Sequence, residues 1–291
     1  MTSSQPILVR RAKVTSTALA TLVLLALSGG AGLGACSGED VTSGKRVVLQ
    51  TKVALGSGAE APFINADGWS ITLKKAAVSI GPLYYFDGAP IFTASAEPWP
   101  SRARDAFTGL LGIGIAHAHP GHYQAGSAKG EMLEPSSVDL FAGVADLPVG
   151  EGVSGVFRSA RFTFNAPPVG AVVDALAGHV IVVEGEAIKD AQTRIFRATA
   201  DLADVLDSYD EPKVEGCAFE EVDVQADGAV TVEVLPTVWL DQVEFGGVAE
   251  SSDGNPVTLA AGTVEWKEFI RGVKKGSAYV FRYAPSAALH K

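Results

Sequence analysis

Three of the five histidines of this 291-residue chain lie within six residues, in the segment Ala116–Tyr123. Neutral imidazole is the commonest protein ligand for zinc and copper. In an extended backbone the side chains of His117 and His119 point to the same side. The Pro-Gly pair that follows can turn the chain so that His122 faces them. This spacing predicts a metal site with three nitrogen ligands on one loop.

Two residues downstream are candidates for a fourth ligand, the carboxylate of Glu131 and the thioether of Met132. A thioether beside imidazoles favours copper, whereas a carboxylate favours zinc, so both metals stay open. The alternative is an ordinary exposed loop, because Gly, Ala, Pro and His are also common in such loops. The sequence has no H-E-x-x-H motif and no paired C-x-x-C motif, which would identify a known class of metal site.

The N-terminus has the three regions of a secretion signal. Basic residues at positions 10–13 precede an apolar run at residues 18–27, which is shorter than a membrane span, and small residues follow. The sequence Leu33-Gly34-Ala35-Cys36 then resembles the lipobox of bacterial lipoproteins. This resemblance implies cleavage before Cys36, with lipid such as palmitate attached to its sulfur and its new amino group. The alternative is a secretory signal without lipid.

The signal divides the chain into three parts. We expect residues 1–35 to be a signal peptide, residues 36–46 a tether, and residues 47–291 a single β domain. Ser37, in place of Asp, is compatible with sorting to the outer membrane. The N-terminal lipid then makes the membrane a partner, and we expect a location in the cell envelope, on the outer membrane and facing the periplasm or the surface.

Charge and cysteine content limit the possible partners. Loss of residues 1–35 removes three of the 23 basic residues and none of the 33 acidic ones, which leaves 20 against 33, a net charge of about −13. Phosphate backbones would repel such a chain, so we expect no nucleic-acid partner. If Cys36 is acylated, Cys217 has no cysteine to pair with, and no basic neighbour stabilises its thiolate. We expect Cys217 to be a buried, small apolar residue.

Alternation of apolar and polar residues predicts that most of the mature chain is β structure. The expected strands cover residues 47–55, 69–73, 76–86, 138–141, 157–165 and 277–283, with two hairpins at 179–188 with 193–202 and at 218–224 with 229–235. Residues 90–133 show no periodicity and form a long loop that bears the histidines. Residues 238–245 and 264–273 have helical spacing. The predicted fold is an all-β antiparallel β-sandwich with a long His-bearing loop and one or two short helices near the C-terminus.

Several of these features together resemble the methanobactin-associated copper-protein type of periplasmic β domain. They are the Gly68-Trp69 start of a strand, the histidine-bearing loop and the late segment Trp239-Leu240-Asp241. The resemblance implies an association with copper. The chain departs from members that have a four-cysteine pattern, because it contains only Cys36 and Cys217.

Two functions follow from these observations. The first is a lipid-anchored envelope protein that binds copper or zinc for storage, sensing or handover, with His117, His119 and His122 as ligands. The second is a non-metal interaction module that binds envelope polysaccharide or an outer-membrane protein. Its contact aromatics would be Trp99, Tyr84 and Tyr85, although one of the two tyrosines should lie in the core because adjacent strand residues face opposite ways.

An enzymatic function is not expected. The sequence has no G-x-S-x-G nucleophile elbow. Asp139, Asp201, Asp204 and Asp207 have no spacing that would identify a general acid and its base, and the last three are more simply explained as a solvated acidic connection. We also expect His179, at the start of a strand, to have a structural role.

Overall fold

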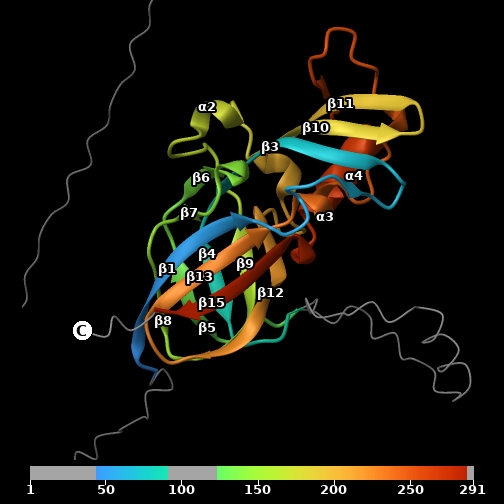
Figure 1. Cartoon of the computed structure of the whole chain (residues 1–291). Helices are drawn as coiled ribbons and strands as arrows, with labels where there is room; N and C mark the ends of the chain where they lie inside the picture. Colours follow the sequence, from blue (N-terminus) through green and yellow to red (C-terminus); the bar gives the residue numbers. More distant parts are fainter. Residues whose placement is uncertain (1–43, 91–122, 287–291) are drawn as a thin grey trace, which may run out of the picture. The chain divides into compact units, whose positions relative to one another are not determined.

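The computed structural model describes residues 44–90 and 123–286 (Figure 1). Strands dominate these ranges and the helices are short, which confirms the predicted all-β class. The predicted signal peptide, most of the tether and residues 91–122 of the histidine-bearing loop lie outside the described residues. Among the helices in the described ranges, none is both long enough and apolar enough to cross a membrane.

Eight strands form one closed sheet, a β-barrel. They are β1 (Arg46–Leu55), β4 (Leu83–Phe86), β5 (Ala128–Met132), β8 (Gly150–Val153), β9 (Gly155–Thr163), β12 (Lys213–Val224), β13 (Gly228–Val234) and β15 (Tyr279–Pro285). Their order is β13-β15-β12-β9-β4-β5-β8-β1, and β1 returns to β13 in a parallel pairing from Leu49 opposite Gly228 to Leu55 opposite Val234. The short strand β7 (Ala145–Asp146) pairs with β1 beyond the end of β8.

The predicted antiparallel sandwich agrees with this structure only in broad layout. Both architectures enclose a core between facing strands, but here the sheet closes on itself, and β12 with β15, like β1 with β13, pairs in parallel. Alternation along a strand shows which residues face the core. It does not show whether the first and last strands of a sheet meet, because closure depends on strand tilt and stagger.

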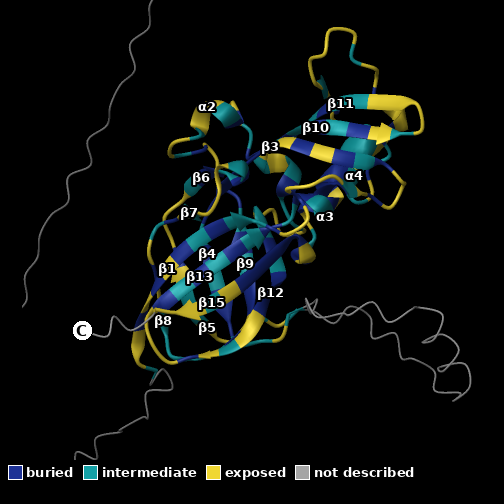
Figure 2. Cartoon of the chain, in the orientation of Figure 1, coloured by how far each residue is buried: buried dark blue, intermediate teal, exposed yellow. Residues whose placement is uncertain are grey.

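The barrel interior is packed with side chains. The alternation expected in β1 is present, with Val47, Leu49, Thr51 and Val53 buried and the residues between them more exposed (Figure 2). Aromatic rings fill the centre. Tyr85 is fully buried, stacks on Phe157 at 6.1 Å between ring centroids, and meets Phe219 and Phe281 edge-on at 5.7 and 5.9 Å. Such aromatic pairs add to the stability gained from burial itself.

A second, smaller sheet lies beside the barrel. Its strands are β2 (Phe63–Ile64), β3 (Ser70–Ile80), β6 (Ser136–Asp139), β10 (Ile181–Lys189), β11 (Gln192–Ala200) and β14 (Val257–Thr258). The order is β14-β11-β10-β3-β2, with β6 also paired to β3. The predicted hairpin of residues 179–188 and 193–202 is confirmed as β10 and β11. Buried residues of both sheets belong to one hydrophobic cluster, so the two sheets share a core.

One continuous segment of the chain contributes a strand to each of the two sheets. The expected strand at residues 76–86 is divided at Gly81 and Pro82, where β3 of the second sheet ends and β4 of the barrel begins. Proline cannot donate a ladder hydrogen bond, which explains the break. Gly81 is required for close approach, because a Cβ there would lie 2.6 Å from Thr163 Oγ1.

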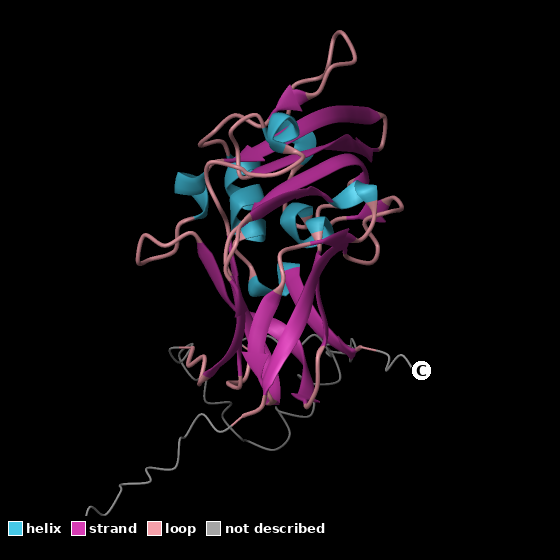
Figure 3. Ribbon diagram, turned by 90° about the vertical axis from the view of Figure 1, so that its left-hand side faces the viewer, coloured by secondary structure: helices cyan, strands magenta, loops and turns pink. Residues whose placement is uncertain are grey.

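The helices are short and lie in the half of the molecule that contains the second sheet (Figure 3). They are α2 (Val173–Leu176), α3 (Pro236–Leu240) and α4 (Val264–Val273), with 3-10 turns η1 (Leu140–Ala142), η2 (Leu202–Val205), η3 (Phe245–Gly247) and η4 (Gly276–Ala278). The expected helix at 264–273 is confirmed, and the one expected at 238–245 begins and ends earlier, as α3. The hydroxyl of Thr263 caps α4 by accepting from the N–H of Trp266 at 3.3 Å.

The predicted hairpin of residues 218–224 and 229–235 is wrong. These residues belong to β12 and β13, but β15 lies between the two strands and pairs with both. The Asp227-Gly228 turn does reverse the chain. The Asp227-Gly228 turn therefore predicted correctly that the chain reverses, but it did not predict that another strand, β15, lies between β12 and β13.

Asn65 connects the second sheet to the helical region and is itself buried. Its side-chain amide donates to the carbonyls of Leu240 at 3.1 Å and Val243 at 2.8 Å, and its side-chain oxygen accepts from the N–H of Trp69 at 2.9 Å. These carbonyls lie at the C-terminal end of α3 and just beyond it, where the carbonyls no longer have donors within the helix. Asn65 therefore bonds three backbone groups; the Leu240 carbonyl also accepts from the N–H of Val243 at 3.2 Å.

We predict that Asn65→Ala lowers the free energy of unfolding by about 2–4 kcal/mol, because it leaves buried polar groups unpaired. Chemical denaturation followed by circular dichroism measures the change. Asn255→Ala is the matched control, since the Asn255 side chain is exposed and bonds only to Asp253 among the described residues. Equal effects of the two substitutions would contradict the role given to Asn65.

Candidate functional site

The structure describes two of the five predicted metal ligands, Glu131 and Met132. His117, His119 and His122, and the lipidation residue Cys36, lie outside the described residues. Met132 is fully buried in the core and pairs with Leu83, whereas Glu131 is exposed. Successive strand residues project to opposite faces. Of the two candidates for a fourth ligand, Glu131 is therefore the one that solvent reaches.

The histidine-bearing segment begins and ends at one place on the barrel. It connects β4 to β5, which are neighbouring strands. The Gly88 N–H donates to the carbonyl of Ala125 at 2.9 Å, and the Ser127 N–H donates to Asp87 Oδ1 at 2.7 Å. Lys129 Nζ lies 3.4 Å from Asp87 Oδ2. These contacts hold the two ends of the connection together, whatever the path between them.

Tyr123 attaches one end of this segment to the barrel wall. Its hydroxyl lies 2.6 Å from Ser159 Oγ on β9. Burial raises the pKa of Tyr123 above its ordinary value, and the hydrogen bond with Ser159 opposes this only in part. The phenol is therefore neutral at physiological pH. Tyr123 directly follows His122 in the sequence, so the residue that is bonded to the barrel wall is the next one after the last predicted ligand.

Glu131 lies in a shallow groove of about 460 Å³ on the outer side of β1, β5 and β8. It is directly opposite Glu151 in the β5–β8 pairing, an arrangement of like charges that destabilises a sheet. Over residues 44–90 and 123–286, however, no group of three or more His, Cys, Asp or Glu side chains is arranged to hold a metal ion. The described part of the chain supplies a pair of carboxylates here, and not a full set of ligands.

The acidic connection after β11 has structural partners. Asp201 Oδ1 lies 2.6 Å from His179 Nδ1, and Asp204 Oδ2 accepts from the N–H of Asp201 at 2.8 Å. Asp207 Oδ1 accepts from the N–H of Tyr209 at 2.7 Å. These contacts stabilise a capped 3-10 turn and the loop after it. His179 has the structural contact expected of it, whereas the three aspartates, expected to form a solvated connection, also make specific hydrogen bonds.

Cys217 is buried, as predicted, and has no disulfide partner among the described residues. Burial raises the pKa of its thiol to about 12, with smaller opposing effects from nearby backbone groups. A thiol with this pKa is protonated and unreactive at neutral pH.

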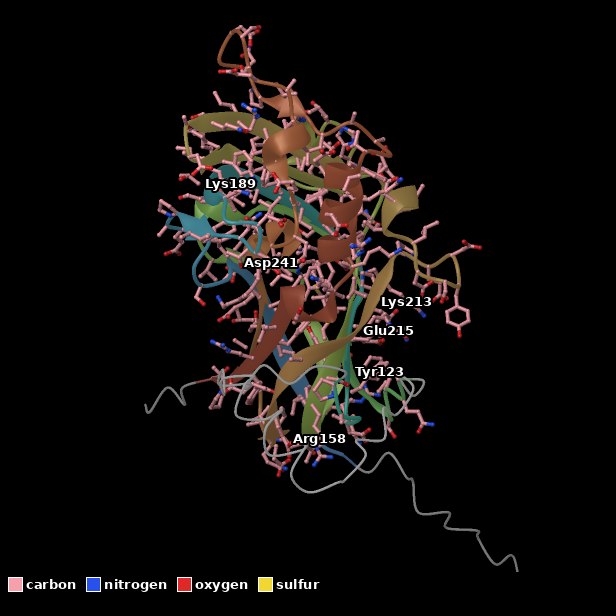
Figure 4. All side chains as sticks on the ribbon, turned by 90° about the vertical axis from the view of Figure 1, so that its right-hand side faces the viewer. Tyr123, Arg158, Lys189, Lys213, Glu215 and Asp241 are labelled. Carbon is pink, nitrogen blue, oxygen red and sulfur yellow. The ribbon has the colours of Figure 1, made fainter. Side chains whose placement is uncertain are left out.

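A polar site of which the sequence indicated only Tyr84, as a candidate contact aromatic, lies on the outer side of β4, β9 and β12. We call it the Arg161 face and define it by the side chains of Tyr84, Arg161, Thr163, Lys213 and Glu215. Arg161 Nη2 donates to Glu215 Oε1 at 2.7 Å, and the Arg161 guanidinium lies 5.6 Å from the ring centroid of Tyr84. Figure 4 shows Lys213, Glu215 and Tyr123 following one another along this side of the molecule.

Lys213 connects the Arg161 face to the loop at Asp207. Its ammonium contacts Glu211, lies 3.2 Å from Glu215 Oε1 and 3.6 Å from Asp207 Oδ2, and its side chain is only 11% exposed. Burial lowers the pKa of Lys213, but the hydrogen bonds to Glu211 and Glu215 outweigh it and raise that pKa overall. Burial raises the pKa of Asp207, and the N–H groups of Glu211 and Tyr209 together with Lys213 outweigh it and lower that pKa. Both groups are charged at neutral pH.

We predict that Asp207→Asn reduces the free energy of unfolding by about 1 kcal/mol at neutral pH, because the N–H donors lose a charged acceptor. The folded-state pKa of Asp207 is below the unfolded value of about 3.9, so this stabilisation is present at neutral pH and is lost as the pH falls through the folded pKa. The difference between wild type and variant should therefore shrink in acid. Urea unfolding at neutral and at acidic pH measures it, with Asp210→Asn in the same turn as control, and a difference that grows in acid would refute the argument.

Comparison with known proteins gives one distant structural neighbour. No known protein family matches the sequence, and no curated protein matches it. The solved structure of MbnP from Methylosinus trichosporium aligns with 82% of this chain and 99% of its own length, at 10% sequence identity and a TM-score of 0.40. At this level of similarity no ligand, site or activity transfers from MbnP to this chain.

Proposed function

We propose that this chain is a non-enzymatic, lipid-anchored protein of the cell envelope that binds copper or zinc for storage, sensing or handover. The observation that carries the proposal is the presence of three imidazoles, those of His117, His119 and His122, within six residues. They belong to a connection whose two ends are hydrogen-bonded together on a rigid barrel. Holding the ends of a loop reduces the entropy that its ligands lose on binding a metal.

The environment of β5 bears on the choice of metal. Glu131 is exposed and Met132 is buried in the barrel interior. A Met132 ligand would have to leave a closely packed core, which costs about 2–5 kcal/mol in lost packing. A Glu131 ligand requires no such change, and a carboxylate next to imidazoles favours zinc. We therefore infer that Glu131 is the better candidate for a fourth ligand, and zinc the better candidate for the metal.

We predict that replacing His117, His119 and His122 together with alanine abolishes stoichiometric binding of both zinc and copper. Elemental analysis and calorimetry on the mature chain without a histidine tag measure the loss. His179→Gln is the matched control, because His179 is the histidine bonded to Asp201 and should not affect metal content. Unchanged retention of both metals by the triple variant would end the proposal.

The fourth ligand has a separate test. Glu131→Gln should weaken zinc binding about tenfold or more, as expected for the loss of one charged ligand. Met132→Leu keeps a similar volume in the core and should leave binding unchanged. The reverse result would identify Met132 as the ligand and favour copper.

The lipid anchor rests on the lipobox resemblance at Cys36. We predict that Cys36→Ser transfers the protein from the membrane fraction to the aqueous fraction, because the acylated sulfur is lost. Fractionation of the envelope followed by immunoblotting measures this. Cys217→Ser is the control, since Cys217 is buried in the barrel and is not expected to carry lipid. Membrane retention of the Cys36→Ser protein would contradict lipid anchoring.

A second candidate function is a non-metal interaction module that binds envelope polysaccharide or an outer-membrane protein. The observation that favours it is the position of Tyr84. Of the two neighbouring tyrosines Tyr85 is in the core, as expected, and Tyr84 is partly exposed beside Arg161. The strongly acidic charge does not support nucleic acid as a partner. Recovery of one stoichiometric partner with and without a chelator would favour this function over metal binding.

A further inference from the structure

The Arg161 face surrounds a pocket of about 310 Å³ on the outer wall of the barrel. Two rows of outward side chains cross the same three strands. In one row Tyr84 pairs with Arg161, which bonds to Glu215. In the next row the hydroxyl of Thr163 donates to the carbonyl of Pro82 at 2.6 Å, and Thr163 pairs with Lys213 on its other side. The volume is at the lower end of that of small-molecule sites and suits a single ring.

The polar groups of this pocket are fixed before any ligand arrives. The Arg161 guanidinium lies between two aromatic rings, 5.6 Å from the centroids of Tyr84 and Phe86, and is bonded to Glu215. Lys213 is held by Glu211 and Glu215. Charged side chains that are already ordered lose little conformational entropy on binding. Such preorganisation is what a binding site requires, and solvent-exposed surface ion pairs do not normally show it.

The charged side chains around the pocket are all paired. Arg161 is bonded to Glu215, and Lys213 lies against Glu211, Glu215 and Asp207, so the group carries one more negative charge than positive. An anionic or a cationic ligand would have to break one of these pairs. A neutral ligand with several hydroxyl groups would not, because each hydroxyl both donates and accepts and can bridge neighbouring charged groups. The partly exposed ring of Tyr84 adds an apolar surface beside them.

We propose that this pocket binds one neutral, polyhydroxylated ring, a sugar residue of an envelope glycan. The inference does not depend on metal binding, and it rests on the second candidate function, to which it gives a location and a ligand class. Polar contacts come from Arg161, Glu211 and Lys213, which line the pocket, and the flat apolar contact comes from Tyr84.

Ligand-observed NMR titration of the mature full chain tests the proposal, with N-acetylglucosamine and glucose as neutral probes and with glucosamine and glucuronate as charged ones. We expect saturable binding of at least one neutral sugar, and weaker binding of its charged relatives. Tyr84→Leu, which leaves the Arg161–Glu215 and Lys213–Glu215 pairs in place, should weaken binding about tenfold, the equivalent of one contact. Lys213→Met should weaken it to a similar extent.

Two controls separate this site from other surfaces. Lys74→Met removes a lysine paired with Glu186 on the second sheet and should leave sugar binding unchanged. The triple histidine variant should also bind sugar normally, so that failure of the metal proposal and failure of this one can be distinguished. Absence of binding to both neutral sugars, tighter binding of a charged sugar, or binding unaffected by Tyr84→Leu would each overturn the proposal.

Discussion

The parallel pairing of β1 with β13 is the interaction on which the rest of the structure depends. β1 is bonded on its other side to β8 and β7, so this one pairing turns a sheet with two free edges into a closed barrel. One more hydrogen bond extends the β1–β13 pairing beyond Leu49 and Gly228, because the N–H of Val48 donates to Asp227 Oδ1 at 2.8 Å. Closure fixes which side of every strand faces inward. The outward positions of Glu131, Arg161 and Lys213 follow from it.

Closure also requires that the interior be filled. Gly130 leaves room for close packing, since a Cβ there would lie 2.9 Å from the carbonyl of Glu151 and 3.1 Å from the Tyr85 ring. Thr51 is the polar exception on the inner side of β1. β12 and β15 pair only at Ala218 and Phe219 with Val280 and Phe281, and η4 packs against both strands. Gly272 allows α4 to approach α3, because a Cβ there would lie 2.4 Å from the carbonyl of Trp239.

The sequence predicted the parts of the fold that local patterns encode. The strand at residues 47–55, the β10–β11 hairpin and the helix at 264–273 all have a clear period and clear ends, and the structure contains them. Barrel closure and the insertion of β15 between β12 and β13 depend on contacts between distant residues, which no local pattern records. The same distinction applies to the sites. The histidines are neighbours in the sequence and could be found there, whereas Tyr84, Arg161 and Lys213 come together only through the order of three strands.

The hydrogen bond between Gly88 and Ala125 joins the two ends of the connection from β4 to β5. The sequence and length of that connection can therefore change without disturbing the strands on either side. The entropic cost of closing a loop grows only with the logarithm of its length, so insertions or deletions between these two points change the stability of the barrel little. A family of such proteins could therefore diverge in this one segment while the remaining strands stay the same. Changes within this connection and changes within the barrel strands would then affect the stability of the protein separately.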